Sequence, residues 1–229
     1  MWPRWTMMPC SPACATNCLR RLSVMRSTNW DGGDNFCRRP SDRFGPDRKI
    51  VGRAMPVLEA DVFDEGSGSP GPLGGKPFGL MLEALDDLRP NEVYVATGGS
   101  LRYALWGELM STRAGYLRAA GAVINGFVRD AAGIEALGFP TFCRAVYAQD
   151  QGPRGKVIDF RTPVEIEGVR IAPGDLIFGD REGVLIVPAE VESEAVAAAL
   201  AKSSTENRVA TAIREGMSAR EPFETFGVL

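Results

Sequence analysis

The apolar positions between residues 49 and 96 follow strand-like and helix-like spacings in turn. Residues 49–63 are mostly apolar and predict one or two strands, interrupted at Pro56 because proline cannot donate a ladder hydrogen bond. Pro90 ends the helix that follows. The inner face of that helix is predicted from its i, i+3, i+4 and i+7 positions, which are Phe78, Met81, Leu82 and Leu85. Residues 93–96 then predict a short buried strand.

The same alternation continues as far as residue 138. Residues 97–100 predict a turn, and a second helix is predicted from residue 107 to residue 121. Residues 122–125 predict the next strand, and Gly138 ends a short helical turn. The inner face of the second helix is predicted from its apolar residues, which are Leu109, Met110, Leu117 and Ala120.

After residue 138 the pattern is rich in strands. Glu167-Gly168 is a two-residue hairpin signal between two short strands within residues 163–171. A further reverse turn is predicted at residues 180–183, and an Ala-rich helix covering the sheet is predicted at residues 190–214. The strands that flank the turn are predicted at residues 176–178 and 184–187. Strands that alternate with helices first and follow one another later predict an α/β fold with an additional β layer.

Residues 1–30 differ from the rest of the chain, because they contain four arginines and no acidic residue before Asp31. They are predicted to be a disordered, transit-like leader or an over-extended start upstream of Met25. Residues 31–229 are predicted to form a single domain. Three cysteines of the leader are spaced by four residues, and a soft-metal site is the alternative to an unstructured segment for them. These cysteines are Cys10, Cys14 and Cys18.

The composition is typical of a globular protein, with 45% hydrophobic and 24% charged residues in 229. A net charge of −3 argues against nucleic-acid binding, which normally requires a basic face. No apolar run approaches the roughly 20 residues that a membrane-spanning helix needs. We therefore expect a soluble, cytoplasmic protein with neither a nucleic acid nor a membrane as its partner.

The chain contains no histidine. This excludes Ser-His-Asp and Cys-His catalysis, zinc held by histidine, and a histidine general base. Proton transfer must then fall to carboxylate, lysine, tyrosine, cysteine or water groups. Carboxylates without imidazole favour a hard, oxygen-ligated cation such as magnesium or manganese.

Gly107 stands immediately before the second predicted helix, in the run Trp-Gly-Glu-Leu-Met at residues 106–110. The first turn of a helix presents backbone N–H groups without intrahelical partners, and such groups bind carboxylate or phosphate. The alternative is an ordinary helix start without a ligand.

Arg129 and Asp130 follow the strand predicted at residues 122–125. Ligands of α/β sheets usually lie at the C-terminal ends of strands. Arginine offers a fixed fork of donors to a carboxylate or a developing oxyanion, and aspartate offers an oxygen ligand to a hard cation. The alternative for this pair is a surface ion pair or a turn cap.

WGELM at residues 106–110, followed by INGFVRD at residues 124–130, resembles the RraA-like family. This family includes 4-hydroxy-4-methyl-2-oxoglutarate aldolases, oxaloacetate decarboxylases and a regulator of ribonuclease E activity. The similarity covers roughly residues 48 to 190, and the specific signal is the ordered series of motifs rather than any one of them. The other matching segments lie at residues 51–54, 138–142, 163–164, 168–169, 173–180, 182–184 and 187–188.

The resemblance implies an α/β fold of the swivelling three-layer β/β/α type, assembled as a homotrimer or a higher homo-oligomer. It also implies that the backbone of Gly107, Glu108, Leu109 and Met110 binds a small 2-oxo acid. Arg129 is then expected to contact the substrate oxygens. Asp130 is expected to ligate magnesium or manganese, with waters completing the coordination shell.

The implied reaction is retro-aldol cleavage or decarboxylation through a pyruvate enolate, whose charge a divalent cation and Arg129 would stabilise. Glu108 is the candidate for orienting or deprotonating a water, although an acid at a helix start is also favourable for dipole reasons. Asn125 occupies a place where the family often has aspartate. Asp180 and Glu182 form either an ordinary turn or part of a neighbouring subunit's site.

The alternative function is a non-catalytic regulator that binds and masks a ribonuclease, which the family's namesake suggests. That function needs a protein-binding surface rather than an intact metal site. The presence of Glu108, Arg129 and Asp130 together favours the enzyme.

Overall fold

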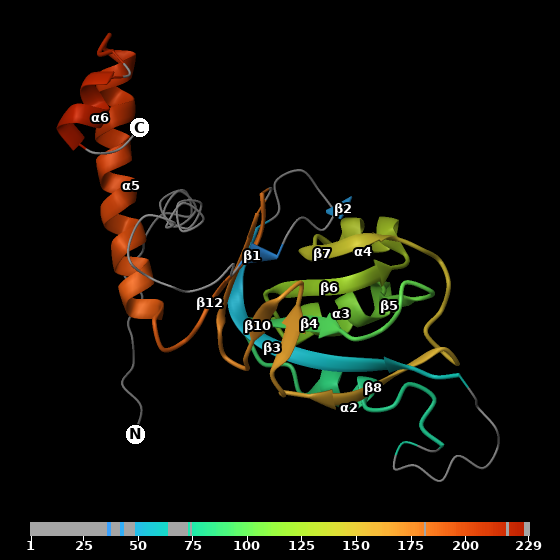
Figure 1. Cartoon of the computed structure of the whole chain (residues 1–229). Helices are drawn as coiled ribbons and strands as arrows, with labels where there is room; N and C mark the ends of the chain where they lie inside the picture. Colours follow the sequence, from blue (N-terminus) through green and yellow to red (C-terminus); the bar gives the residue numbers. More distant parts are fainter. Residues whose placement is uncertain are drawn as a thin grey trace. The chain divides into compact units, whose positions relative to one another are not determined.

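The computed structural model describes residues 36–37, 42–43, 49–63, 73, 75–180, 182–218 and 220–226 (Figure 1). The chain divides into two compact units, of which one spans Gly32–Ala189 and the other contains Glu190–Leu229. In the second unit, α5 (Glu192–Arg214) confirms that the predicted C-terminal segment is helical, and α6 (Arg220–Phe226) follows it. That α5 covers the sheet stays a prediction. The predicted leader and its three cysteines lie outside the described residues. The predicted single domain from residue 31 to residue 229 stays a prediction.

The larger unit is built on one mixed sheet. Its strands follow the order β1 (Phe36–Cys37), β12 (Gly183–Val187), β11 (Leu176–Asp180), β3 (Ile50–Asp61), β4 (Glu92–Thr97), β6 (Gly121–Val128), β7 (Thr141–Val146) and β2 (Asp42–Arg43). Two further strands lie off this path, with β5 (Ala104–Trp106) paired to β6 and β8 (Gly155–Phe160) paired to β3. The central strands β3, β4, β6 and β7 run parallel, and β5 is parallel to β6.

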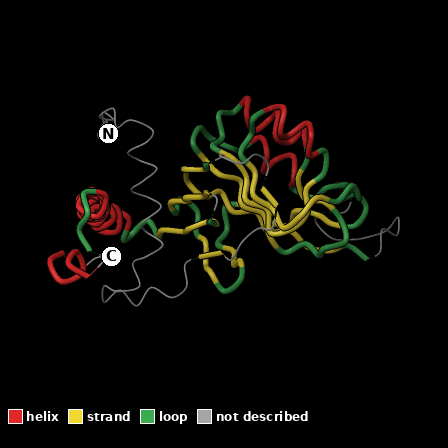
Figure 2. Tube along the Cα trace, turned by 90° about the horizontal axis from the view of Figure 1, so that it is seen from above, coloured by secondary structure: helices red, strands yellow, loops and turns green. Residues whose placement is uncertain are grey.

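Two layers cover the sheet, one on each face. On one face lie the short helices α2 (Met81–Asp86), α3 (Glu108–Tyr116) and α4 (Ala131–Leu137), which Figure 2 shows gathered on one side of the strands. On the other face packs the hairpin of β9 (Val164–Ile166) and β10 (Val169–Ile171). The predicted α/β fold of the three-layer β/β/α type is therefore confirmed.

Strand β4 shows how one segment serves both layers. Tyr94 and Ala96 belong to the core beneath the helices, whereas Val93 and Val95 belong to the core beneath the hairpin. Successive side chains of a strand point to opposite faces, so a strand covered on both faces is apolar throughout. This explains the uninterrupted apolar run that predicted a buried strand here.

Pro56 does not interrupt β3, which runs unbroken over 12 residues. On one side β3 pairs with β11 through residues 50–53 and then with β8 through residues 57–61. Pro56 lies between the two partners, where no ladder bond requires its missing N–H, and its carbonyl accepts the N–H of Arg161 at 2.8 Å. The predicted interruption was wrong because the change of partner accommodates the proline.

The helices are shorter than their apolar spacing predicted. Helix α2 begins at Met81 and ends at Asp86, and α3 ends at Tyr116 rather than near Gly121. Leu82 and Leu109 were predicted on inner faces but are exposed, Leu109 by 79%. The buried residues of α3 are Ser111 and Ala114, whose small side chains allow the helix to approach the sheet closely, and Met110 packs partly buried against the same core as predicted.

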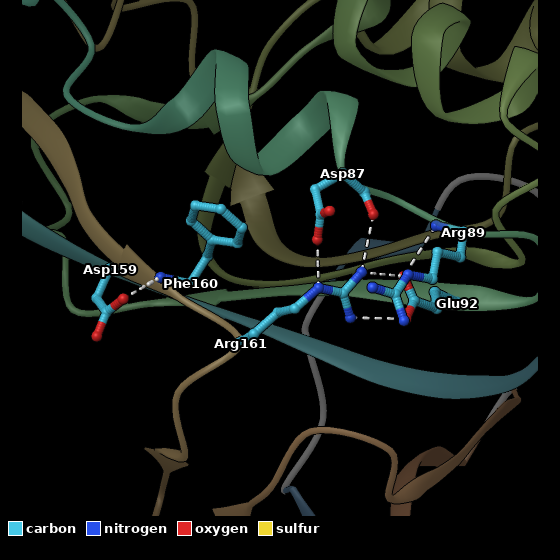
Figure 3. Close-up of polar contacts among 6 residues, drawn as sticks. All are labelled: Asp87, Arg89, Glu92, Asp159, Phe160 and Arg161. Atoms are coloured by element: carbon cyan, nitrogen blue, oxygen red, sulfur yellow. Dashed lines mark hydrogen bonds and ion pairs between the residues drawn. The ribbon is translucent and has the colours of Figure 1, made fainter.

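A cluster of charged side chains joins β8 to β4 at the start of the parallel strands (Figure 3). Arg161 donates from Nη1 and Nη2 to the two carboxylate oxygens of Glu92, at 2.8 and 2.9 Å, and from Nε to Asp87. The Glu92 hydrogen bonds, followed by those of Asp87, raise the pKa of Arg161. This fork-to-carboxylate contact fixes the turn after β8 against the sheet.

Candidate functional site

The site begins where β5 ends and α3 begins. Gly107 is buried and extended, at φ −156° and ψ −176°, and serves as the N-cap of α3. The first hydrogen bond of the helix joins the Ser111 N–H to the Gly107 carbonyl at 3.0 Å. The backbone N–H groups of residues 108–110 therefore have no acceptor within the helix, which is the arrangement that binds anions.

Trp106 holds this helix start against the core. Its indole Nε1 donates to Ser111 Oγ at 2.7 Å, and its ring packs against Tyr94 and Phe139, with centroids 4.8 and 6.1 Å away. Its carbonyl accepts the Arg129 N–H at 2.9 Å. Trp106 is thus a packing residue, and its carbonyl ties the start of α3 to the end of β6.

Arg129 and Asp130 lie directly against Gly107. A methyl group on the Gly107 Cα would be 3.1 Å from Asp130 Oδ2 and 3.3 Å from Arg129 Cγ. Glycine therefore leaves a small space between the helix start and the two charged side chains. The structure brings together the turn and the Arg-Asp pair, which the sequence had placed about 20 residues apart.

Asp130 adopts the left-handed conformation, at φ 57° and ψ 39°, and is the N-cap of α4. Aspartate tolerates this conformation better than most residues. Its carbonyl, rather than its side chain, accepts the first helical hydrogen bond, from the Ile134 N–H at 3.1 Å. The carboxylate makes no capping hydrogen bond and stays exposed, so it can offer an oxygen to a ligand.

The Arg129 guanidinium lies between two carboxylates. Nε is 3.5 Å from Asp130 Oδ2, and Nη1 is 3.5 Å from Asp150 Oδ1. Asp150 was missed from the sequence, since it belongs to an irregular loop with no motif around it. The contacts with these carboxylates use Nε and Nη1, and the guanidinium retains further N–H groups that can receive a substrate oxygen.

The other predicted site residues are placed less centrally. The Glu108 carboxylate packs against Gly133 of α4, where a methyl group would overlap it. Leu109 points to solvent, while Met110 is half-buried against the core under the helices. A ligand role for the backbone of these three residues stays a prediction.

Asn125 and Asp180 have structural partners. The Asn125 amide donates to Thr97 Oγ1 at 2.8 Å and accepts from Arg144 Nε at 2.7 Å, which joins three neighbouring strands. Asp180 Oδ1 accepts the Glu182 N–H at 2.8 Å within the predicted turn. The turn is confirmed, and a role for either acid in a neighbouring subunit stays a prediction.

A second acidic group, Glu59, is buried near the loop that carries Asp150. Burial raises its pKa to about 8. Its Oε2 accepts from Gln151 Nε2 at 2.8 Å, whereas Oε1 and the nearby Tyr94 hydroxyl have no hydrogen-bond partner among the described residues. No sequence pattern distinguished Glu59, because a single acid within a strand usually faces solvent.

The donor set fits a hard cation that retains water ligands. Among the described residues no group of three cysteine, aspartate or glutamate side chains converges to enclose an ion. Asp130 offers one exposed carboxylate beside the space at Gly107, and magnesium is commonly held by one or two carboxylates together with waters and substrate oxygens. None of the helices in the described part of the chain is long and apolar enough to cross a membrane.

The family model described as "RraA-like: Aldolase/RraA" matches residues 31–186. Protein DlpA of Legionella pneumophila is 32% identical over 153 residues, which cover 66% of this chain and 25% of that protein. A protein of Halalkalibacterium halodurans named "Putative 4-hydroxy-4-methyl-2-oxoglutarate aldolase" is 31% identical over 140 residues, which cover 61% of this chain and 66% of that protein. The chain thus spans a quarter of the first relative and just under two thirds of the second.

Among solved structures, Streptomyces coelicolor RraAS2 is described as an unusual member of the RNase ES inhibitor RraA protein family. It superposes with a TM-score of 0.67 at 21% identity, covering 86% of this chain and 90% of that one. At this identity the similarity shows the fold alone.

Proposed function

Because this chain belongs to the RraA-like family, we propose that it is a divalent-metal-dependent lyase that acts on small 2-oxo acids. The reaction would be retro-aldol cleavage or decarboxylation, with a pyruvate enolate as the common product of bond breaking. The observation that carries the proposal is the space at Gly107, which is bounded by unpaired helix N–H groups, the Arg129 fork and the Asp130 carboxylate.

Each group has a role that follows from its chemistry. The N–H groups of residues 108–110 bind the substrate carboxylate at the positive end of α3. Arg129 directs its guanidinium to the oxo oxygen, where negative charge develops as the carbon–carbon bond breaks. Asp130 would hold the cation, which when bound supplies Lewis acidity at the same oxygen. Attraction to the emerging charge therefore grows toward the transition state, as catalysis requires.

Glu108 completes the proposal as a water-orienting group. Its carboxylate lies at the first turn of α3 and against the first turn of α4, so it borders the site without pairing to Arg129 among the described residues. From there it can position a water that returns a proton to the enolate carbon. We also propose that the protein is cytoplasmic and forms a homotrimer. Light scattering on the purified protein checks the oligomeric state.

The test is pyruvate release from oxaloacetate and from an aldol adduct of pyruvate, with magnesium or manganese and after chelation. Arg129→Ala and Asp130→Ala should each lower kcat/KM by about 100-fold or more, the scale seen when one transition-state charge partner is removed. Arg113→Ala is the matched control, because its side chain is also 40% exposed and pairs with an aspartate away from the site. Full activity in either site variant, or activity that a chelator leaves unchanged, would refute the mechanism.

A regulator that binds a ribonuclease is the second candidate. The observation that favours it is the exposure of Leu109 and Tyr116 on α3, at 79% and 78%, since protein-binding surfaces often display such side chains. Tight ribonuclease binding that is lost in a Leu109→Ser, Tyr116→Ser double variant, without lyase activity on any 2-oxo acid, would establish this function instead.

A further inference from the structure

Asp150 is a third charged group beside the proposed site. It lies in the loop between β7 and β8, and its Oδ1 is 3.5 Å from Arg129 Nη1. The same oxygen accepts the N–H of Gln151 at 2.9 Å. One carboxylate oxygen of Asp150 therefore faces the guanidinium, and the N–H of the next residue holds that oxygen in place.

The loop that carries Asp150 is tied to the interior at several points. Gln149 accepts the Ala104 N–H at 2.8 Å through its carbonyl, next to the strand that leads to Gly107. The Gln151 side chain donates to the buried Glu59 at 2.8 Å. Arg154 Nη1 donates to the carbonyls of Asp150 and Gly152, at 3.2 and 3.1 Å. These hydrogen bonds hold the loop in place, and they therefore fix the position of the Asp150 carboxylate relative to Arg129.

We propose that Asp150 is a positioning residue, which holds the Nη1 edge of Arg129 so that the guanidinium stays beside the space at Gly107, where Nε would be 3.4 Å from a methyl group on the Gly107 Cα. With Asp130 at Nε and Asp150 at Nη1, the plane of the guanidinium is set by two carboxylates from different elements. Without Asp150, Arg129 would pair with Asp130 alone and occupy oxygens that the cation needs. This inference rests on the proposed function for its catalytic consequence, but not for the geometry.

The expected effect concerns orientation rather than stability. Both side chains are about half exposed, so the ion pair itself contributes little to folding. A small loss of orientation at a reacting group can still cost far more in rate, since effective molarity depends on alignment. The loss should therefore appear in kcat and leave the melting temperature unchanged.

Asp150→Asn tests this directly. The asparagine Oδ1 can still accept the Gln151 N–H, while the negative charge that faces Arg129 is lost. Asp159→Asn is the matched control. Asp159 Oδ1 likewise accepts the N–H of the next residue, Phe160, at 2.8 Å (Figure 3), and no ion pair of Asp159 is present among the described residues. The two substitutions remove the same charge from the same backbone motif.

Two measurements decide the proposal. In the metal-free protein, the Arg129 Nε–H signal is identified by its absence in Arg129→Lys, and its NMR order parameter should fall in Asp150→Asn but not in Asp159→Asn. With oxaloacetate and magnesium, kcat should fall about tenfold in Asp150→Asn with little change in KM, and Asp150→Glu should recover part of it.

An unchanged Arg129 order parameter in Asp150→Asn would overturn the proposal, and so would an equal loss in both asparagine variants. A loss confined to KM would also overturn it, because that result indicates steering of the substrate by charge. If the wild-type protein releases no pyruvate, the proposed function fails, while the NMR measurement still decides whether Asp150 positions Arg129.

Discussion

Glu59→Gln measures how much the burial of one acidic side chain in β3 lowers the free energy of unfolding. Glu59 is only 2% exposed, and burial raises its pKa from 4.5 to about 8. One of its oxygens has no hydrogen-bond partner among the described residues. The folded protein therefore keeps this proton over a range of pH in which the unfolded chain has released it.

The sign and size of the effect follow from proton linkage. Between pH 4.5 and about 8 the folded state binds one more proton at Glu59 than the unfolded state, so stability falls as pH rises. Each pH unit within this window costs about 1.4 kcal/mol, and the whole window costs about 5 kcal/mol. Below pH 4.5 both states are protonated at this group, and the cost disappears.

Glutamine keeps the size of the side chain and cannot ionise, and its amide can still pair with Gln151. Urea unfolding of both proteins from pH 4.5 to pH 9 should show similar free energies of unfolding at the acid end. As pH rises, the free energy of unfolding of the variant should exceed that of the wild type by about 1.4 kcal/mol more for each pH unit, up to about 5 kcal/mol. Glu165→Gln, on the exposed face of β9, is the control. The difference between its free energy of unfolding and that of the wild type should not change with pH. A constant difference between Glu59→Gln and wild type would mean that Glu59 is ionised in the folded protein.

Three further predictions concern the site and the sheet. Gly107→Ala should lower kcat/KM at least tenfold, because the methyl group fills the space beside Asp130. The melting temperature should change little, because the backbone there is extended. Gly115→Ala is the control and should keep activity, because its methyl group would be 4.0 Å from the nearest atom. Arg161→Ala should lower the free energy of unfolding by about 2 kcal/mol in urea, because it removes the charge partner of Glu92 and leaves that carboxylate only the Arg89 N–H among the described residues. The exposed Arg220→Ala should change the free energy of unfolding by less than about 0.5 kcal/mol. Asn125→Asp should keep lyase activity in the pyruvate assay, since that side chain pairs with Thr97 and Arg144 rather than with the site.

Much of the fold follows from local patterns. The hairpin at Glu167 and Gly168 was predicted from two residues, and both have the positive φ, 52° and 84°, that such a turn requires. The buried strands β4 and β6 were evident from apolar runs. Helix α3 was predicted too long. Met110 and Leu117 pack against the core as predicted, but Leu109 was wrongly assigned to the inner face. The small buried Ser111 and Ala114 were missed.

Features that depend on distant pairing could not be predicted. Pro56 was expected to break its strand, and only the change of partner from β11 to β8 explains why it does not. Asp150 contacts Arg129 directly, and Glu59 is linked to Asp150 through Gln151, yet neither acid stood out within its own segment. Local composition carries no information about which loop will lie beside which strand end.

The predicted site differs from these features because one topological relation brings its parts together. Strands β5 and β6 are parallel neighbours, with Trp106 opposite Val128 in the register. The residues that follow each strand must therefore meet, and these residues are Gly107 on one strand and Arg129 on the other. The Trp106 carbonyl and the Arg129 N–H, 2.9 Å apart, extend this pairing by one more bond. An insertion of one residue between Trp106 and Gly107 should consequently separate the helix start from Arg129 and abolish lyase activity, even though every side chain of the site is retained.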